Sequence, residues 1–116
     1  MTLRAIRNLL GAEVLCDAAL LDNEVNSAFA ADLMSDVLAF VDERCLLLTG
    51  LVNQHVIITA EMVDVCGIVF VRGKKPGEEI LQLAKERNIG ILCTEKTLYE
   101  SSGILYTHGL GSIKGR

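Results

Sequence analysis

The chain has 116 residues, of which 51% are hydrophobic, and this length encloses one hydrophobic core rather than two. The formal net charge is −4, and of the 11 Lys and Arg residues only Arg72, Lys74 and Lys75 lie close together, unlike the basic surface of a nucleic-acid-binding protein. The apolar runs are far shorter than the roughly 20 residues that cross a bilayer, and residues 2–10 lack the apolar segment and cleavage site of a secretory signal. We therefore expect a cytoplasmic domain that binds neither nucleic acid nor membrane.

The first half of the chain predicts two helices and two strands. Thr2 is the expected N-cap of an amphipathic helix that ends at Gly11, and residues 12–16 form a short strand. Residues 24–30 alternate as a second strand does. Asp32 is then the expected cap of a helix whose apolar positions repeat at helical spacing.

The second half repeats a unit of one strand and one helix. Residues 45–49, 67–71 and 89–93 are apolar strands, and residues 54–63 form a helix after the first of them. Pro76 starts the next helix, with acids in its first turn and bases in its last, and Thr94 caps the final one. This alternation predicts right-handed crossovers and a mainly parallel sheet covered on both faces. Residues 111–116 are an expected flexible tail.

The four cysteines predict neither a metal site nor a cofactor. Cys16, Cys45, Cys66 and Cys93 each lie more than twenty residues from the next and have no histidine at metal-ligand spacing. Each borders an apolar strand-like run, which is typical of small buried side chains in a reducing compartment.

Several segments, taken in order, resemble one known family. They are Phe29-Ala-Ala-Asp32-Leu-Met-Ser35-Asp36-Val-Leu38, Leu47-Leu-Thr49-Gly50, Thr59-Ala-Glu61-Met62, Ile68-Val-Phe-Val-Arg72-Gly73-Lys74-Lys75-Pro76 and Leu92-Cys-Thr94. Together they resemble the DRTGG domain over residues 1–110. The pentad that gives the family its name is absent, and residues 49–53 stand where such a polar turn would fall.

The resemblance implies a fold and a broad role. The implied fold is a three-layer α/β/α sandwich with a mainly parallel sheet of about five strands, similar to the N-terminal domain of HPr kinase/phosphorylase and the N-terminal region of MurF. The implied role is that of a regulatory or dimer-forming module, such as those inserted in phosphotransacetylases and in pyrophosphatases with CBS domains. A larger enzyme is therefore a possible partner, and the resemblance supplies no catalytic residue.

Three turns at the carboxyl ends of the predicted strands are the candidate ligand site. Ligands of open parallel sheets bind at this edge, where turns lead into helix N-termini that attract anions. The candidate residues are Thr49, Gly50, Asn53, Arg72, Gly73, Lys74, Lys75, Thr94 and Lys96. If the turns are adjacent, these residues form an electropositive pocket for a small anionic metabolite, such as a phosphate, a carboxylate or a nucleotide. The alternative is that the glycines only form turns and the basic side chains are solvated.

Asp32 and Asp36 lie four residues apart on one face of a predicted helix. Such a pair can share a cation or act as acid and base. The alternative, which we favour, is that Asp32 caps the helix and Asp36 complements its dipole. Ser35 between them lacks a histidine partner and a nucleophile elbow.

The remaining candidates for catalysis are two histidines and one cysteine. His55 and His108 are far apart in the sequence, and neither has an evident partner. Cys93 directly precedes a predicted helix start, which can stabilise a thiolate, but it also fits a packed strand residue. We therefore expect a non-catalytic module; the alternative is a small phosphoryl- or acyl-transfer enzyme that uses Asp32, Asp36 or Cys93.

The high apolar content predicts a homodimer. A short sheet in a small chain leaves apolar surface that a second subunit can cover. Bulky apolar residues occur in the half where the pattern is least regular, and the candidate interface residues are Val25, Phe29, Met34 and Phe40. The alternative is that these residues belong to the core.

Overall fold

A twisted sheet forms the centre of the fold in the computed structural model, which describes residues 1–113. In this part of the chain five strands lie in the order β1-β5-β4-β3-β2. The strands are β1 (Glu13–Val14), β2 (Ser27–Ala30), β3 (Cys45–Thr49), β4 (Val65–Phe70) and β5 (Gly90–Cys93). Strands β2 to β5 are parallel, and β1 is antiparallel to β5.

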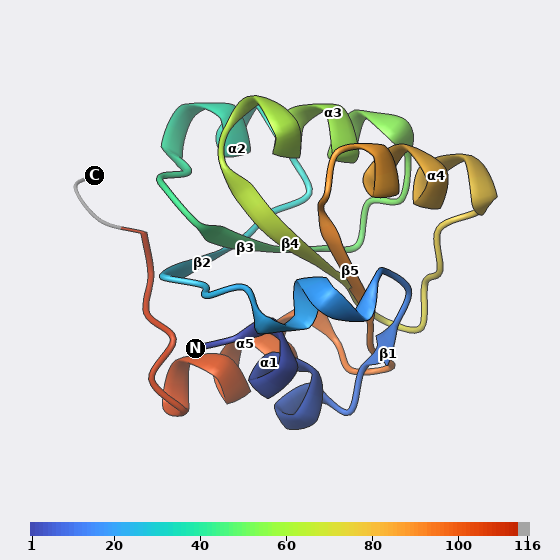
Figure 1. The fold of residues 1–116 in the computed structure, drawn as a ribbon. Coiled ribbons are helices and arrows are strands. Elements are labelled where there is room, and N and C mark those ends of the chain that lie inside the picture. Colours follow the sequence, from blue (N-terminus) through green and yellow to red (C-terminus); the bar gives the residue numbers. More distant parts are fainter. Residues whose placement is uncertain (114–116) are drawn as a thin grey trace.

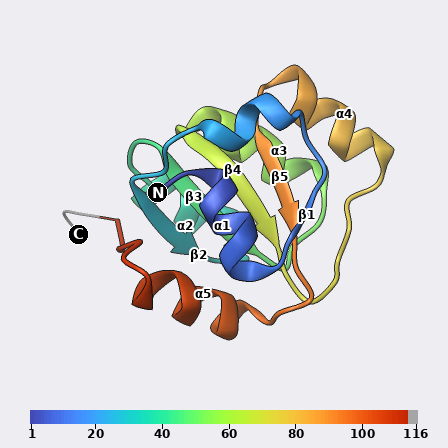
Figure 2. The same cartoon turned by 60° about the horizontal axis from the view of Figure 1, so that its bottom comes forward.

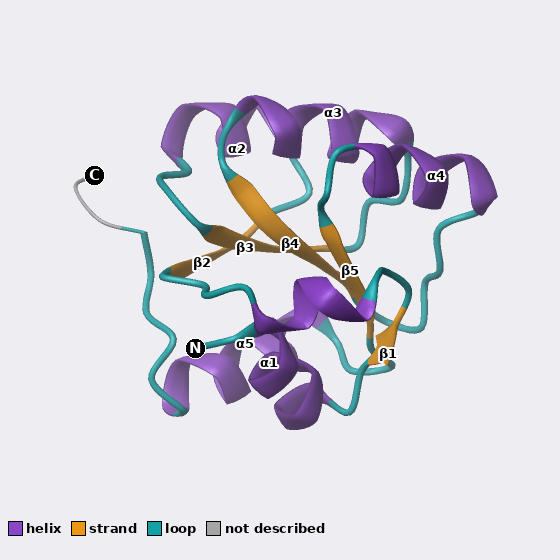
Figure 3. Ribbon diagram, viewed as in Figure 1, coloured by secondary structure: helices purple, strands orange, loops and turns teal. Residues whose placement is uncertain are grey.

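Helices cover both faces of this sheet (Figure 1). One face carries α2 (Met34–Phe40), α3 (Gln54–Met62) and α4 (Glu78–Glu86). The other carries α1 (Leu3–Leu10) and α5 (Leu98–Thr107), which lie side by side in Figure 2. A 3-10 helix, η1 (Ala18–Asp22), joins β1 to the segment that leads into β2. Figure 3 shows the resulting layers of helix, strand and helix, which confirm the predicted three-layer α/β/α fold.

Alternate side chains of each central strand enter different cores. In β3, Leu46 and Leu48 pack with α1 and α5, whereas Leu47 packs with α2 and α3 on the other face. This is the period of two that a pleated strand imposes. Because both faces of β3 to β5 are buried, these strands are continuous apolar runs, and that is why their positions could be predicted from sequence.

Two glycines in adjacent strands receive the side chain of Leu3. Gly67 of β4 and Gly90 of β5 are paired in register. A Cβ atom on Gly67 would lie 2.7 Å from Leu3 Cδ2, and one on Gly90 would lie 2.6 Å from Leu3 Cδ1. The absence of side chains at this pair therefore allows α1 to approach the sheet closely.

Helix α1 has the predicted caps. The Thr2 hydroxyl accepts a hydrogen bond from Ala5 N at 3.2 Å, and Gly11 ends the helix in the left-handed region at a φ of 60°. Three other predicted helix starts, at Asp32, Pro76 and Thr94, are wrong. Helix α5 runs without a break through Gly103.

Asp32 and Thr94 are not helix caps because their side chains bond to remote partners. Helix α2 begins at Met34 after Leu33, and the Asp32 carboxylate bonds to the end of β3. Helix α5 is capped by Thr97, whose hydroxyl accepts from Glu100 N at 3.2 Å. The Thr94 hydroxyl instead donates to Leu10 O at 2.9 Å.

Helix α4 begins two residues later than predicted. Pro76 is buried and precedes the helix, and Gly77 at the N-cap has an extended backbone with a ψ of 176°. The predicted placement of Glu78 and Glu79 in the first turn is confirmed. These acids and the basic last turn complement the helix dipole.

Strand β1 and the start of the predicted tail lie at opposite edges of the sheet. Strand β1 is shorter than predicted because the chain turns away after Leu15, whose N–H donates to Ile91 O at 2.9 Å. Of the predicted flexible tail, residues 114–116 lie outside the described residues. Gly111 O accepts from Ala28 N at 2.9 Å, which places the start of that segment along β2. Within residues 1–113, no helix is long and apolar enough to cross a membrane.

Candidate functional site

The three predicted turns meet at the carboxyl ends of β3, β4 and β5. The turn after β4 is bonded to the turn after β5, because Arg72 N donates to Lys96 O at 2.8 Å and Gly73 N donates to Thr94 O at 2.9 Å. The turn after β3 joins them through the Lys74 side chain, whose Nζ donates to Gly50 O at 2.9 Å. The parallel sheet therefore brings the candidate segments to one edge.

Asp32 lies at the β3 end of this edge, where it bonds to the turn that was predicted to contact an anionic ligand. Its Oδ1 accepts from the Thr49 hydroxyl at 2.9 Å and from Gly50 N at 2.8 Å. The bond from Gly50 and, to a smaller extent, the bond from Thr49 hold the pKa of Asp32 below its usual value. The charges of Arg72 and Lys74 lower this pKa further. An internal carboxylate thus takes the backbone N–H that we expected a ligand to use.

Arg72 lies against the turn after β3 in an unusual backbone conformation. Its φ is 58°, in the left-handed region that residues other than glycine rarely adopt. Its Nη2 lies 3.0 Å from the place that a Cβ on Gly50 would occupy, so a side chain at position 50 would require the guanidinium to shift. Arg72 is an exposed residue and Lys96, in the turn after β5, is half-buried, so both offer a cation at this edge.

Most backbone N–H groups of the three turns already have acceptors within the protein. Leu51 N donates to the Thr49 hydroxyl at 3.1 Å, and Lys96 N donates to the Thr94 hydroxyl at 3.3 Å. Lys74 N donates to Val71 O at 3.2 Å. A ligand at this edge would therefore contact cationic side chains more than free backbone amides.

Three other candidate ligand residues have partners or close neighbours within the protein. Asn53 caps α3, with its Oδ1 accepting from Val56 N at 3.2 Å. Gly73, at a φ of 69°, faces Glu95, whose Oε1 lies 2.9 Å from the place of a Cβ on Gly73. Lys75 pairs with Glu13 of β1, Nζ to Oε1, at 2.7 Å and so points away from Gly50; this pairing raises the pKa of Lys75.

The candidates for catalysis do not assemble into one site. Asp36 lies in the first turn of α2, whereas Asp32 precedes that helix, so the two do not share one helix face. Cys93 is a buried strand residue, and burial raises the pKa of its thiol to about 11. His55 lies on α3 and His108 ends α5 on the opposite face of the sheet. No group of three or more His, Cys, Asp or Glu residues in 1–113 is placed to hold a metal ion.

The candidate dimer residues differ in their exposure. Val25 is 2% exposed and belongs to the core, so it offers no side-chain area to a second subunit. Phe29 and Met34 are half-buried, and the rings of Phe29 and Phe40 lie 6.4 Å apart. Phe40 is 38% exposed. Two exposed apolar residues of the same region, Leu33 at 60% and Leu38 at 44%, were not among the predicted ones.

Comparison with known proteins identifies a family and a fold. The family model of the DRTGG domain matches residues 5–107. A solved structure of the CBS and DRTGG domains of the regulatory region of Clostridium perfringens pyrophosphatase, in complex with its activator diadenosine tetraphosphate, is similar, with a TM-score of 0.71 and 19% sequence identity. The match covers 90% of this chain and 45% of that one, so this chain spans less than half of that structure. No curated protein matches significantly.

Proposed function

The chain belongs to the DRTGG domain family, and from that premise we propose that it is a non-catalytic regulatory module that binds a small anionic ligand. The observation that carries this proposal is the position of Arg72 and Lys74 around the turn after β3, with Arg72 held in the left-handed region. Strained backbone at such a position is typical of binding sites. The similar pyrophosphatase structure is a regulatory region bound to a nucleotide activator, which supports the same role here.

A phosphate group is the ligand chemistry that fits these residues best. A guanidinium binds phosphate with two parallel hydrogen bonds, and an ammonium adds a second charge. The internal carboxylate of Asp32 competes for the same cations, so the ligand must outweigh it. Because Asp32 directly precedes the loop into α2, we expect its release to change the start of that helix and so to convey ligand binding to the surface of α2.

The ligand proposal is tested by measuring stability and binding with defined anions. Inorganic phosphate, AMP, ATP, diadenosine tetraphosphate and acetate are titrated by calorimetry and by urea unfolding. A ligand at a hundred times its dissociation constant should add about 2.7 kcal/mol to the free energy of unfolding. Arg72→Ala and Lys74→Ala should weaken binding. Lys75→Ala is the matched control, because Lys75 has the same charge but pairs with Glu13.

Two results would contradict this ligand proposal. One is that none of these anions changes the urea midpoint. The other is that Lys75→Ala weakens binding as much as Lys74→Ala does, since the charge of the loop alone would then explain the effect.

We also propose that the chain forms a homodimer through α2. The support is the exposed apolar surface of Leu33, Leu38 and Phe40, because exposed apolar patches mark contact surfaces. Light scattering should give the mass of a dimer, and Leu38→Glu should give a monomer. Tyr106→Glu, at a 72% exposed residue on α5, is the control and should leave the dimer intact. A monomer at high protein concentration would contradict the proposal.

The proposed setting is cytoplasmic and the proposed partner is a larger enzyme. The four cysteines are free thiols, which are typical of a reducing compartment. The pyrophosphatase structure contains a DRTGG domain together with CBS domains in one regulatory region, and it suggests the kind of enzyme that such a module serves. Catalysis by this chain itself is not supported by any pair of nucleophile and base described above.

A further inference from the structure

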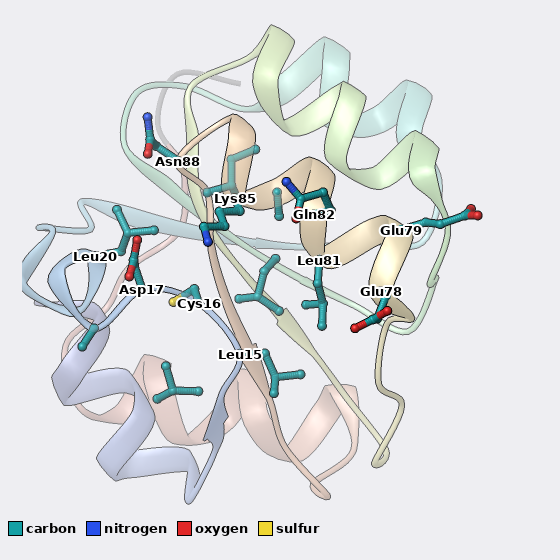
Figure 4. Close-up of a pocket in the computed structure, with 15 residues that line it drawn as sticks. Leu15, Cys16, Asp17, Leu20, Glu78, Glu79, Leu81, Gln82, Lys85 and Asn88 are labelled. Carbon is teal, nitrogen blue, oxygen red and sulfur yellow. The ribbon is translucent and has the colours of Figure 1, made fainter.

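A cleft lies at the β1 edge of the sheet, between α4 and the segment that runs from β1 into η1 (Figure 4). Its volume is about 830 Å³, within the range of small-molecule sites. None of the nine residues of the anion-binding candidate lines it. It is therefore a separate feature from the site proposed above.

The cleft exists because β1 is short. After Leu15 donates to Ile91 O, the chain leaves the edge of β5 and continues into η1, which packs against α1. On the other side, α4 rests on the sheet through the small side chain of Ala84, its one fully buried residue. The apolar floor between them consists of Leu15, Leu81, Ala84, Ile89 and Ile91.

Of the four charged residues that line the cleft, three are acids and one, Lys85, is a base, so the lining carries a net negative charge. Asp17, beside η1, carries a negative charge, and Lys85, near the end of α4, carries a positive one. Glu78 lies seven residues before Lys85, which is about 10 Å along the helix and beyond the reach of strong interaction in salt. No side-chain partner of Glu78 occurs in the described part of the chain.

The neighbouring acid, Glu79, has a different surrounding. Glu79 also lines the cleft, but its Oε2 accepts from Gln54 Nε2 of α3 at 3.5 Å, and in Figure 4 its carboxylate points away from the cleft while that of Glu78 points toward it. Both acids lie in the first turn of α4 and interact in the same way with the helix dipole. A difference in ligand binding between variants at these two positions therefore reflects contact with the cleft and not the helix dipole.

We propose that this cleft binds a small organic cation, a primary amine carried on an apolar body. The apolar body packs on Leu15 and Leu81, and the ammonium lies at Glu78. An apolar floor bordered by a few polar or charged groups is the usual composition of a ligand site. This inference does not depend on the anion-binding function, because the two sites share no residue.

Three matched probes test the proposal by nuclear magnetic resonance on the full, isotope-labelled chain. Hexylamine has both the cation and the apolar body, hexanoate has the body with the opposite charge, and ethylamine has the cation with little body. We expect saturable shifts at Leu15, Cys16 and Leu81 with hexylamine, and at least about fivefold weaker binding of the other two probes. Equal binding of hexanoate, or no saturable shift with hexylamine, would overturn the proposal.

Two variants test the role of Glu78. Glu78→Gln should weaken hexylamine binding about two- to fivefold, as for one exposed ion pair, and Glu79→Gln should leave it unchanged. Both side chains are exposed, so both variants should keep the native spectrum. Equal loss in the two variants would assign the effect to the general charge of α4 and would contradict recognition in the cleft. Phosphate binding at Arg72 should be the same in both.

Discussion

The Asp32 carboxylate accepts a hydrogen bond of 2.8 Å from the backbone N–H of Gly50, although 18 residues separate the two in the sequence. This bond connects the loop between β2 and α2 to the turn after β3. With the Thr49 hydroxyl as a second donor, Asp32 fills the place where parallel α/β folds bind anionic ligands. The resting domain thus contains its own anion at the proposed site.

Replacing Asp32 should destabilise the fold. We expect Asp32→Ala to lower the free energy of unfolding by about 1–2 kcal/mol, because it removes two hydrogen bonds to a charged, largely exposed group. Urea unfolding at neutral pH measures the change. Asp36→Ala is the control, because no such bonds to its carboxylate occur within residues 1–113, and it should change stability by less than about 0.5 kcal/mol. Equal effects of the two variants would contradict a special role for Asp32.

The contribution of Asp32 should depend on pH with a definite sign. The Gly50 N–H, the Thr49 hydroxyl and the nearby cations lower its pKa in the folded state from 3.8. The stabilisation is therefore complete above pH 3.8 and is lost as the pH falls through the lower folded pKa. The difference in unfolding free energy between the native chain and Asp32→Ala should be constant from about pH 7 to 5 and shrink toward about pH 3. A difference that stays constant down to pH 3 would contradict this.

Strands were easier to predict than helix starts. Residues 45–49 are buried on both faces, and such a strand appears in the sequence as a continuous apolar run. A helix cap and a residue with a remote partner use the same side chains, Asp or Thr, before an apolar periodic segment. The remote partner of Thr94 is Leu10, 84 residues away, and no local pattern indicates it.

The candidate site was predictable only in part for a related reason. Parallel strands place their carboxyl ends at one edge, so the meeting of the three turns followed from the order of strands and helices. The carboxylate that fills that edge comes from outside the three turns, and only the fold brings Asp32 to Gly50. The cleft beside α4 was missed because it depends on where the chain leaves β1 after Leu15.

The contact between α1 and the paired glycines can be tested with a double-mutant cycle. Gly67→Ala should destabilise the fold by about 1–3 kcal/mol, because its Cβ would lie 2.7 Å from Leu3 Cδ2. Leu3→Ala makes room for that methyl group, so the double variant should be more stable than the sum of the single changes predicts, by at least about 0.5 kcal/mol. Gly103→Ala, in an open position of α5, should instead stabilise the fold. Strict additivity of Gly67→Ala and Leu3→Ala would contradict the contact.

The four thiols should differ in their reactivity. Burial raises the pKa of the Cys45 thiol to about 12 and that of the Cys93 thiol to about 11. It also raises the pKa values of the half-buried Cys16 and Cys66 thiols. The thiolate is the reactive form, so iodoacetamide at about pH 8 should modify Cys16 and Cys66 before the two buried thiols. Mass spectrometry of the digested protein gives the order. Preferential modification of Cys93 would restore the hypothesis that it is an activated nucleophile.

The left-handed backbone of Arg72 should separate stability from ligand binding. Arg72→Gly removes the steric cost of a φ of 58°, which is about 1 kcal/mol for a residue with a side chain, so the free energy of unfolding should stay equal or rise. The same variant removes the guanidinium and should abolish phosphate binding. Arg72→Ala keeps the strain and should lose binding without gaining stability. Urea unfolding and calorimetry on the two variants measure both properties. If Arg72→Gly loses stability as well as binding, the side chain mainly supports the fold; if it keeps phosphate binding, this edge is not the site.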